Sequence, residues 1–162
     1  MRDLTKPLGS IPASTFPESL FFELPVTHQI LIAEDDTDVR DFLTAVLSGA
    51  GYGVTEVVDG AGVLTRLAYA PPALVLLDLH MPMIDGLEAL RRIRSVESWA
   101  DVPVLFLTAS GVTEDMVTAR RLGARGYLVK PIRSADLLAK VKAILDDPGL
   151  LWLDDMTQAR SS

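Results

Sequence analysis

The chain of 162 residues is long enough for one domain with a hydrophobic core and additional terminal segments. It contains no cysteine, which excludes disulfides, thiolate metal sites and cysteine nucleophiles. Its formal net charge of −7 disfavours direct binding of nucleic acid. No apolar run approaches the length of a membrane span or of a signal-peptide core, so we expect a cytoplasmic protein without a membrane partner.

The first 28 residues hold prolines at positions 7, 12, 17 and 25, which is typical of an irregular arm. From residue 29 onward, short apolar runs alternate with amphipathic segments. These patterns predict strands at 30–33, 54–58, 74–77, 104–107 and 126–129, and helices at 37–48, 61–70, 85–95, 112–122 and 134–145. Three of the strands are continuous apolar runs, as expected when helices cover both faces of a parallel sheet. We therefore predict a doubly wound α/β domain with five parallel strands and five helices.

The domain prediction has three parts: an N-terminal arm at 1–28, the α/β domain at 29–146, and a C-terminal tail at 147–162. The tail is too short to form a second domain. Its apolar residues at 150–153 indicate an extension of the last helix or a cap on the core, with contact to a partner as the alternative. The arginines of the third helix, Arg91, Arg92 and Arg94, are interpreted as its solvated face.

Polar side chains occupy the ends of four predicted strands. Glu34 and Asp35 follow the first strand, Asp78 the third, Thr108 the fourth and Lys130 the fifth. The carboxyl ends of strands in such a sheet line one crevice, so these side chains are expected to meet there. Two carboxylates ~4 Å apart repel by about 4 kcal/mol at an effective dielectric of 20, so cations must compensate them. Lys130 supplies one positive charge, and a divalent cation would supply the rest.

The chemistry of this set favours phosphoryl transfer. Oxygen ligands without a histidine or cysteine cluster indicate Mg²⁺, with Mn²⁺ as an alternative. A metal and a lysine can neutralise the oxygens of a transferring phosphoryl group, a threonine can donate a hydrogen bond to it, and a carboxylate can attack.

Together, these motifs resemble the receiver domain of two-component response regulators over about residues 29–145. The matching segments are Glu34-Asp35, Asp78-Leu79-His80-Met81-Pro82 with Asp85-Gly86, Thr108-Ala109, and Gly126-Tyr127-Leu128-Val129-Lys130-Pro131. Their spacings also fit, since 108 − 78 = 30 and 130 − 108 = 22. The resemblance implies a chemotaxis-regulator-like, flavodoxin-like fold with strand order 2-1-3-4-5. It also implies a phosphoprotein that catalyses only its own phosphorylation and dephosphorylation.

The resemblance assigns a role to each site residue. Asp78 would be the phosphoacceptor and a metal ligand. Asp35 would bind Mg²⁺ directly, Glu34 directly or through water, and His80 through its backbone carbonyl. Thr108 and Lys130 would contact the phosphoryl oxygens.

Further positions would control switching and lifetime. Thr108 and Tyr127 would form the conformational switch. The side chains of His80 and Ser110 would tune dephosphorylation. The resemblance also implies a cis peptide bond between Lys130 and Pro131.

A sensor histidine kinase or a histidine phosphotransfer protein would donate the phosphoryl group. The surface of the fourth helix, fifth strand and fifth helix would then change and be read by an effector protein that the sequence does not name. DNA-binding relatives that dimerise through this surface often carry an acidic pair before the tyrosine, where this chain has Gly123-Ala124-Arg125-Gly126. This departure argues against that dimer mode, although a homodimer remains an alternative.

Other functions stay open at this point. The chain could be a phosphorelay intermediate, or a receiver cut from a longer hybrid kinase or regulator. A phosphorylation-independent scaffold is disfavoured because the set of site residues is complete. An Asp-nucleophile phosphohydrolase of the haloacid dehalogenase type would need an acid where this chain has His80. A flavodoxin-like cofactor module would need glycines after the first strand, where this chain has acids.

Overall fold

The computed structural model describes residues 27–111, 113–147 and 149–152. Its strands are β1 (Gln29–Ala33), β2 (Gly53–Val57), β3 (Leu74–Asp78), β4 (Val104–Thr108) and β5 (Gly126–Val129). Its helices are α2 (Thr37–Gly49), α3 (Gly60–Arg66), α4 (Gly86–Ser95), α5 (Glu114–Arg121) and α6 (Ser134–Asp146), with a short 3₁₀ turn, η3 (Glu97–Trp99).

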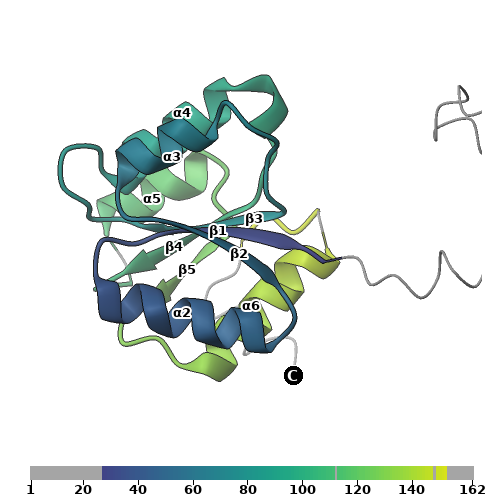
Figure 1. Cartoon of the computed structure of the whole chain (residues 1–162). Coiled ribbons are helices and arrows are strands. Elements are labelled where there is room, and N and C mark those ends of the chain that lie inside the picture. Colours follow the sequence, from purple (N-terminus) through teal and green to yellow (C-terminus); the bar gives the residue numbers. More distant parts are fainter. Residues whose placement is uncertain (1–26, 112, 148, 153–162) are drawn as a thin grey trace, which may run out of the picture.

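The five strands form one parallel sheet in the order β2-β1-β3-β4-β5. Helices α3, α4 and α5 cover one face of this sheet, and α2 and α6 cover the other (Figure 1). The predicted fold class and strand order are therefore confirmed. In this register Ala33 pairs with Leu77 and Asp78 with Leu107, so neighbouring strands end at nearly the same level. The residues that follow them are thereby brought to one edge.

Each face of the sheet has its own hydrophobic core, because successive side chains of a strand point to opposite faces. On the side of α3, α4 and α5, the core includes Leu31, Val75, Leu77, Val104 and Phe106. On the side of α2 and α6, it includes Ile30, Ile32, Leu74, Leu76, Leu105 and Leu107. All these side chains are buried, which explains why the central strands are continuous apolar runs.

The helix that follows β1 is capped by Asp36. Its carboxylate accepts hydrogen bonds from the backbone N–H groups of Asp38 and Val39. This contact satisfies donors that the first helical turn leaves unpaired. Because Asp36 serves as the cap, Glu34 and Asp35 remain available for the crevice.

Two helices differ from their predicted ranges. Helix α3 ends at Arg66 rather than at residue 70, because the chain turns there and the Tyr69 N–H bonds to the Arg66 carbonyl. The buried Trp99 donates its indole N–H to the Tyr69 carbonyl at 3.0 Å and stabilises this turn. Helix α5 begins at Glu114 with Thr113 as its cap, two residues after the predicted start.

The interpretation of Arg94 as a solvated residue is wrong. Its guanidinium donates to the carbonyls of Leu122 and Gly123, at the end of α5, and of Ala100 and Val102, before β4. Burial, together with the nearby charge of Arg125, lowers the pKa of Arg94. Arg94 therefore joins α4 to two loops, whereas Arg91 and Arg92 are exposed and pair with Glu88.

The predicted terminal segments are described only in part. Of the arm at 1–28, only residues 27 and 28 are described, and residues 153–162 of the tail lie outside the described residues. The three-part division of the chain therefore stays a prediction. None of the helices in the described part is long and apolar enough to cross a membrane.

Candidate functional site

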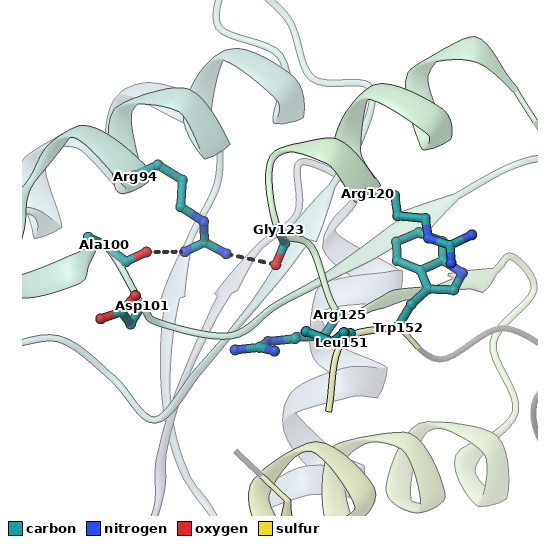
Figure 2. A pocket seen from close by; sticks show the side chains of 8 residues that line it. All are labelled: Arg94, Ala100, Asp101, Arg120, Gly123, Arg125, Leu151 and Trp152. Carbon is teal, nitrogen blue, oxygen red and sulfur yellow. Dashed lines mark hydrogen bonds between the residues drawn. The ribbon is translucent and has the colours of Figure 1, made fainter. Parts of the chain in front are cut away.

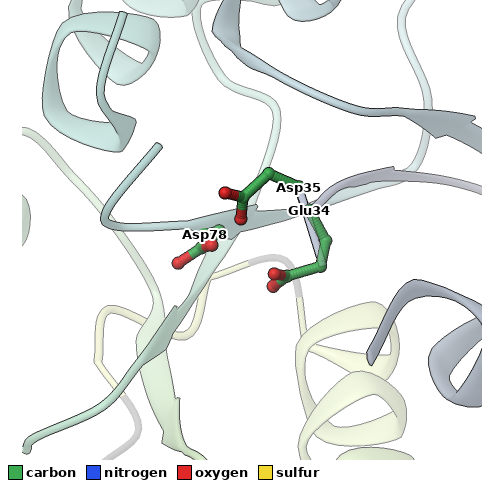
Figure 3. A group of neighbouring side chains, drawn as sticks. All are labelled: Glu34, Asp35 and Asp78. Carbon is green, nitrogen blue, oxygen red and sulfur yellow. The ribbon is translucent and has the colours of Figure 1, made fainter. Parts of the chain in front are cut away.

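Three carboxylates meet where β1 and β3 end. Glu34 and Asp35 follow β1, Asp78 closes β3, and their side chains point toward one another (Figure 3). One oxygen atom from each of the three lies within 4.8 Å of the other two. Glu34 and Asp78 are buried, and Asp35 is exposed. The structure thus brings together the carboxylates that the sequence analysis grouped.

Lys130 compensates the two buried acids. Its ammonium lies 2.9 Å from Oε2 of Glu34 and 3.3 Å from Oδ2 of Asp78. It also donates a hydrogen bond to Oε1 of Glu34 at 3.1 Å. Burial by itself would lower the pKa of Lys130, but the hydrogen bond with Glu34 and the charge of Asp78 outweigh it and raise the pKa. Lys130 therefore remains protonated in the site.

Asp78 is held in a poorly solvated position. Its Oδ1 accepts a hydrogen bond from the His80 backbone N–H at 3.2 Å, and its side chain is only 6% exposed. Burial, followed by repulsion from Glu34, raises the pKa of Asp78 to about 7, although Lys130 acts in the opposite direction. One ammonium is thus too little positive charge for the cluster.

The remaining need fits a divalent cation. Oε2 of Glu34 is fully buried and lies near Lys130, but it accepts no hydrogen bond from the described residues. A buried carboxylate oxygen without a donor is costly, and an oxygen-binding cation would satisfy it. Glu34, Asp35 and Asp78 offer the hard oxygen ligands that Mg²⁺ prefers. The residues present therefore fit such an ion.

Thr108 and the loop after it face the same crevice edge. The Thr108 hydroxyl donates to the Ser110 carbonyl at 2.8 Å, so its proton is engaged by the loop. The Lys130 N–H donates to the Thr108 carbonyl at 2.8 Å, which joins the ends of β4 and β5. The Lys130–Pro131 peptide bond is cis, as the resemblance implied. The side chains of His80 and Ser110 are exposed beside the cluster.

Tyr127 lies on β5 and is largely buried. A Cβ atom added to Gly111 would lie 3.2 Å from the Tyr127 hydroxyl, so the ring occupies space that the glycine leaves open. Lys140, from α6, donates to the Tyr127 carbonyl at 2.8 Å and lies 5.5 Å from the ring centroid. The sequence analysis missed this buried lysine, because its place in an amphipathic helix carries no sign of its partner.

The geometry agrees with a comparison against known families. Residues 30–142 match the model of the response regulator receiver domain, and the chain belongs to this family. The predicted family is therefore confirmed.

Relatives and solved structures agree. The chain is 39% identical to the DNA-binding dual master transcriptional regulator RpaA of Synechocystis, over 72% of this chain and 48% of that protein. It is 40% identical to the transcriptional regulatory protein GltR of Pseudomonas aeruginosa, over 73% and 49%. The chain thus spans about half the length of these curated relatives. Its fold resembles a putative response regulator of Chloroflexus aurantiacus, with a TM-score of 0.70 and 34% identity over 75% of this chain and 99% of that one.

A second solved structure bears on the metal. It is the receiver domain of a sensor histidine kinase of Pseudomonas aeruginosa, described with a magnesium ion coordinated in the active-site cleft. The TM-score is 0.70 and the identity 30%, over 75% of this chain and all of that one.

Proposed function

We propose that this chain receives a phosphoryl group on Asp78 from a phosphohistidine and passes the signal on as a change of its surface. The observation that carries the proposal is the position of Asp78, buried at a strand end between Glu34 and the Lys130 ammonium. An Asp78 oxygen would attack phosphorus as the bond from phosphorus to the donor nitrogen breaks. Such a transfer depends mainly on positioning and charge compensation, which these neighbours provide.

Glu34, Asp35 and Asp78 would hold Mg²⁺, with the His80 carbonyl as a further ligand. The ion would supply positive charge for the transferring oxygens. Its charge would also favour the ionised, nucleophilic form of Asp78, whose pKa is raised to about 7 by burial and by Glu34. Mn²⁺ would suit the same oxygen ligands.

The switch would start at Thr108. Its hydroxyl now donates to Ser110, and a phosphoryl group on Asp78 would offer it an anionic acceptor instead. The loop that carries Gly111 would follow, and Tyr127, which lies against that glycine, would move with it. The surface formed by α5, β5 and α6 would then differ between the two states. The side chains of His80 and Ser110 would tune hydrolysis, since they stand exposed beside the acceptor.

An apolar hollow adjoins the site on the side of α2. It measures about 240 Å³ and is lined by Asp38, Val39, Phe42, Lys130, Pro131 and Ile132. Phe42 is 38% exposed, which is unusual for an aromatic side chain unless it contacts a partner. We infer that a histidine kinase or histidine phosphotransfer protein docks here, with its phosphohistidine directed at Asp78.

The experiment is phosphorylation of the purified chain with acetyl phosphate and Mg²⁺, followed by intact-mass spectrometry. We expect one added phosphoryl group that is lost in base, and none when Mg²⁺ is chelated. Asp78→Asn should abolish the addition, whereas Asp41→Asn, which changes an exposed carboxylate on α2, should preserve it. Stable labelling of the Asp78→Asn variant at another residue would refute the assignment.

A further inference from the structure

Residues 149–152 lie beside the outer edge of the sheet. β5 is the last strand in the sheet order, so one of its sides has no strand neighbour among the described residues. Leu150 packs on the core that α2 and α6 cover, whereas Trp152 packs on the core beneath α3, α4 and α5. The segment therefore passes from one face of the sheet to the other within three residues.

Trp152 contacts the proposed switch residue. Its ring centroid lies 5.9 Å from that of Tyr127, with 50° between the ring planes. The guanidinium carbon of Arg120, on α5, lies 5.4 Å from the Trp152 ring centroid. Both arrangements are attractive, the first between aromatic rings and the second between a cation and a ring. Trp152 thus covers the junction between α5 and β5.

Arg125 holds the backbone of the same segment. Its Nη1 donates to the Leu150 carbonyl, and the Leu150 N–H donates to the Asp147 carbonyl at 3.1 Å. Hydrogen bonds from a charged donor are stronger than neutral ones. Arg125 stands just before β5, where this chain departs from the acidic pair of dimerising relatives. The residue that argues against that dimer mode therefore makes an intramolecular contact.

The attachment of the segment is incomplete. Figure 2 shows a cavity beside it, which measures about 440 Å³ and is lined by Arg94, Ala100, Asp101, Arg120, Gly123, Arg125, Leu151 and Trp152. A second cavity of about 160 Å³ separates Trp152 from Thr113 and Met116. Side chains that line a void lack contacts on that side, so few interactions hold the segment. Leu151 is itself 79% exposed.

We propose that residues 149–152 form an intramolecular clip that occupies the face of α5 and β5 and must leave before a partner protein can pack there. The resting contact stands on the packing of Leu150, Trp152 and Arg125 alone. Its control by phosphorylation rests on the proposed function, because movement of Tyr127 would withdraw one of the supports of Trp152. The clip thus competes with the partner for the surface that carries the signal.

The resting contact is tested by acrylamide quenching of Trp152 fluorescence in the full chain. The contribution of Trp152 is the difference between the wild type and Trp152→Phe, since the other tryptophan, Trp99, is buried. We expect quenching several-fold weaker than that of N-acetyltryptophanamide. Arg125→Ala and Tyr127→Ala should each increase it, whereas Arg121→Ala, an exposed control on α5, should not. Quenching equal to that of the free compound, or unchanged in both variants, would overturn the clip.

Control by phosphorylation is tested on the same proteins with acetyl phosphate and Mg²⁺, while intact mass reports the phosphorylated fraction. We expect Trp152 quenching to rise in proportion to that fraction. If the phosphoryl group is added and quenching does not change, the clip is not controlled by Asp78, although the proposed function stands. If no phosphoryl group is added, the proposed function fails, and the variants of Arg125 and Tyr127 still decide whether the clip exists.

Discussion

At the scale of single residues, Asp78 shows what the site requires. Its carboxylate is buried beside Glu34, and both burial and this neighbour favour the protonated form. Lys130 is shared between the two acids and compensates them only in part. The protein therefore keeps an acid that is costly to ionise where ionisation is needed for attack, and a metal ion would relieve that cost.

The raised pKa of Asp78 predicts how stability depends on pH when metal is absent. The folded state binds the proton with a pKa of about 7, compared with a model value of 3.8. Because the folded state holds this proton more tightly, its contribution to stability is complete at acidic pH and is lost as the pH rises through about 7. In EDTA, the wild type should therefore lose stability across this range.

Asp78→Asn should remove this loss, since the amide cannot ionise. We expect its melting temperature at pH 7.5 without metal to exceed that of the wild type by about 2–8 °C, as for about 1 kcal/mol in a domain of this size. Asp41→Asn serves as the exposed control. Calorimetry at pH 5 and pH 7.5 is the measurement, and parallel behaviour of wild type and Asp78→Asn would contradict the assigned pKa.

At the scale of secondary structure, Arg94 decides how α4 is attached. Its guanidinium bonds four carbonyl groups in two loops, and no other side chain type offers donors in the same planar arrangement. The two loops precede β4 and β5, whose ends carry Thr108 and Lys130. The position of these strands thus depends on a residue far from the site.

Arg94→Lys should destabilise the fold, because one ammonium cannot replace these four hydrogen bonds. We expect a loss of about 1–3 kcal/mol in the free energy of unfolding, measured with urea. Arg91→Lys changes an exposed residue of the same helix that pairs with Glu88 at 3.6 Å, and it should have almost no effect. Equal losses in the two variants would show that the hydrogen bonds of Arg94 contribute little.

At the scale of the whole molecule, chemistry and recognition occupy neighbouring surfaces. The carboxylates and Lys130 lie at the edge of the sheet, and the hollow with Phe42 adjoins Lys130. The face of α5 and β5, where Trp152 lies, is reached through Thr108, Gly111 and Tyr127. A phosphodonor and a downstream partner can therefore use different surfaces.

Phe42→Ala should separate docking from chemistry. Loss of this exposed aromatic should slow transfer from a histidine kinase that phosphorylates the wild type by about tenfold, the effect of losing about 1.4 kcal/mol at an interface. Labelling by acetyl phosphate should be unchanged, since that donor is too small to use the hollow. Tyr69→Ala, an exposed aromatic after α3, is the control. A similar slowing with both donors would mean that Phe42 supports the site itself.

Much of the fold and of the site could be predicted from local patterns. Apolar runs and helix caps are properties of neighbouring residues, so the five strands and their helices were predicted to within a few positions, apart from the end of α3. The turn there depends on Trp99, thirty residues further along the chain, which local periodicity does not reveal. The roles assigned to the site residues stay predictions until phosphorylation is measured.

The sequence by itself determined that polar groups follow buried strands, and the sheet order then requires Glu34, Asp35, Asp78 and Lys130 to share one edge. Only the tertiary structure decided that Lys140 bonds the Tyr127 carbonyl, that Arg94 joins two loops, and that Trp152 reaches the far face of the sheet. The physical reason is separation along the chain. Strand ends meet because parallel pairing places them together, whereas these contacts join residues whose neighbours carry no sign of the partner.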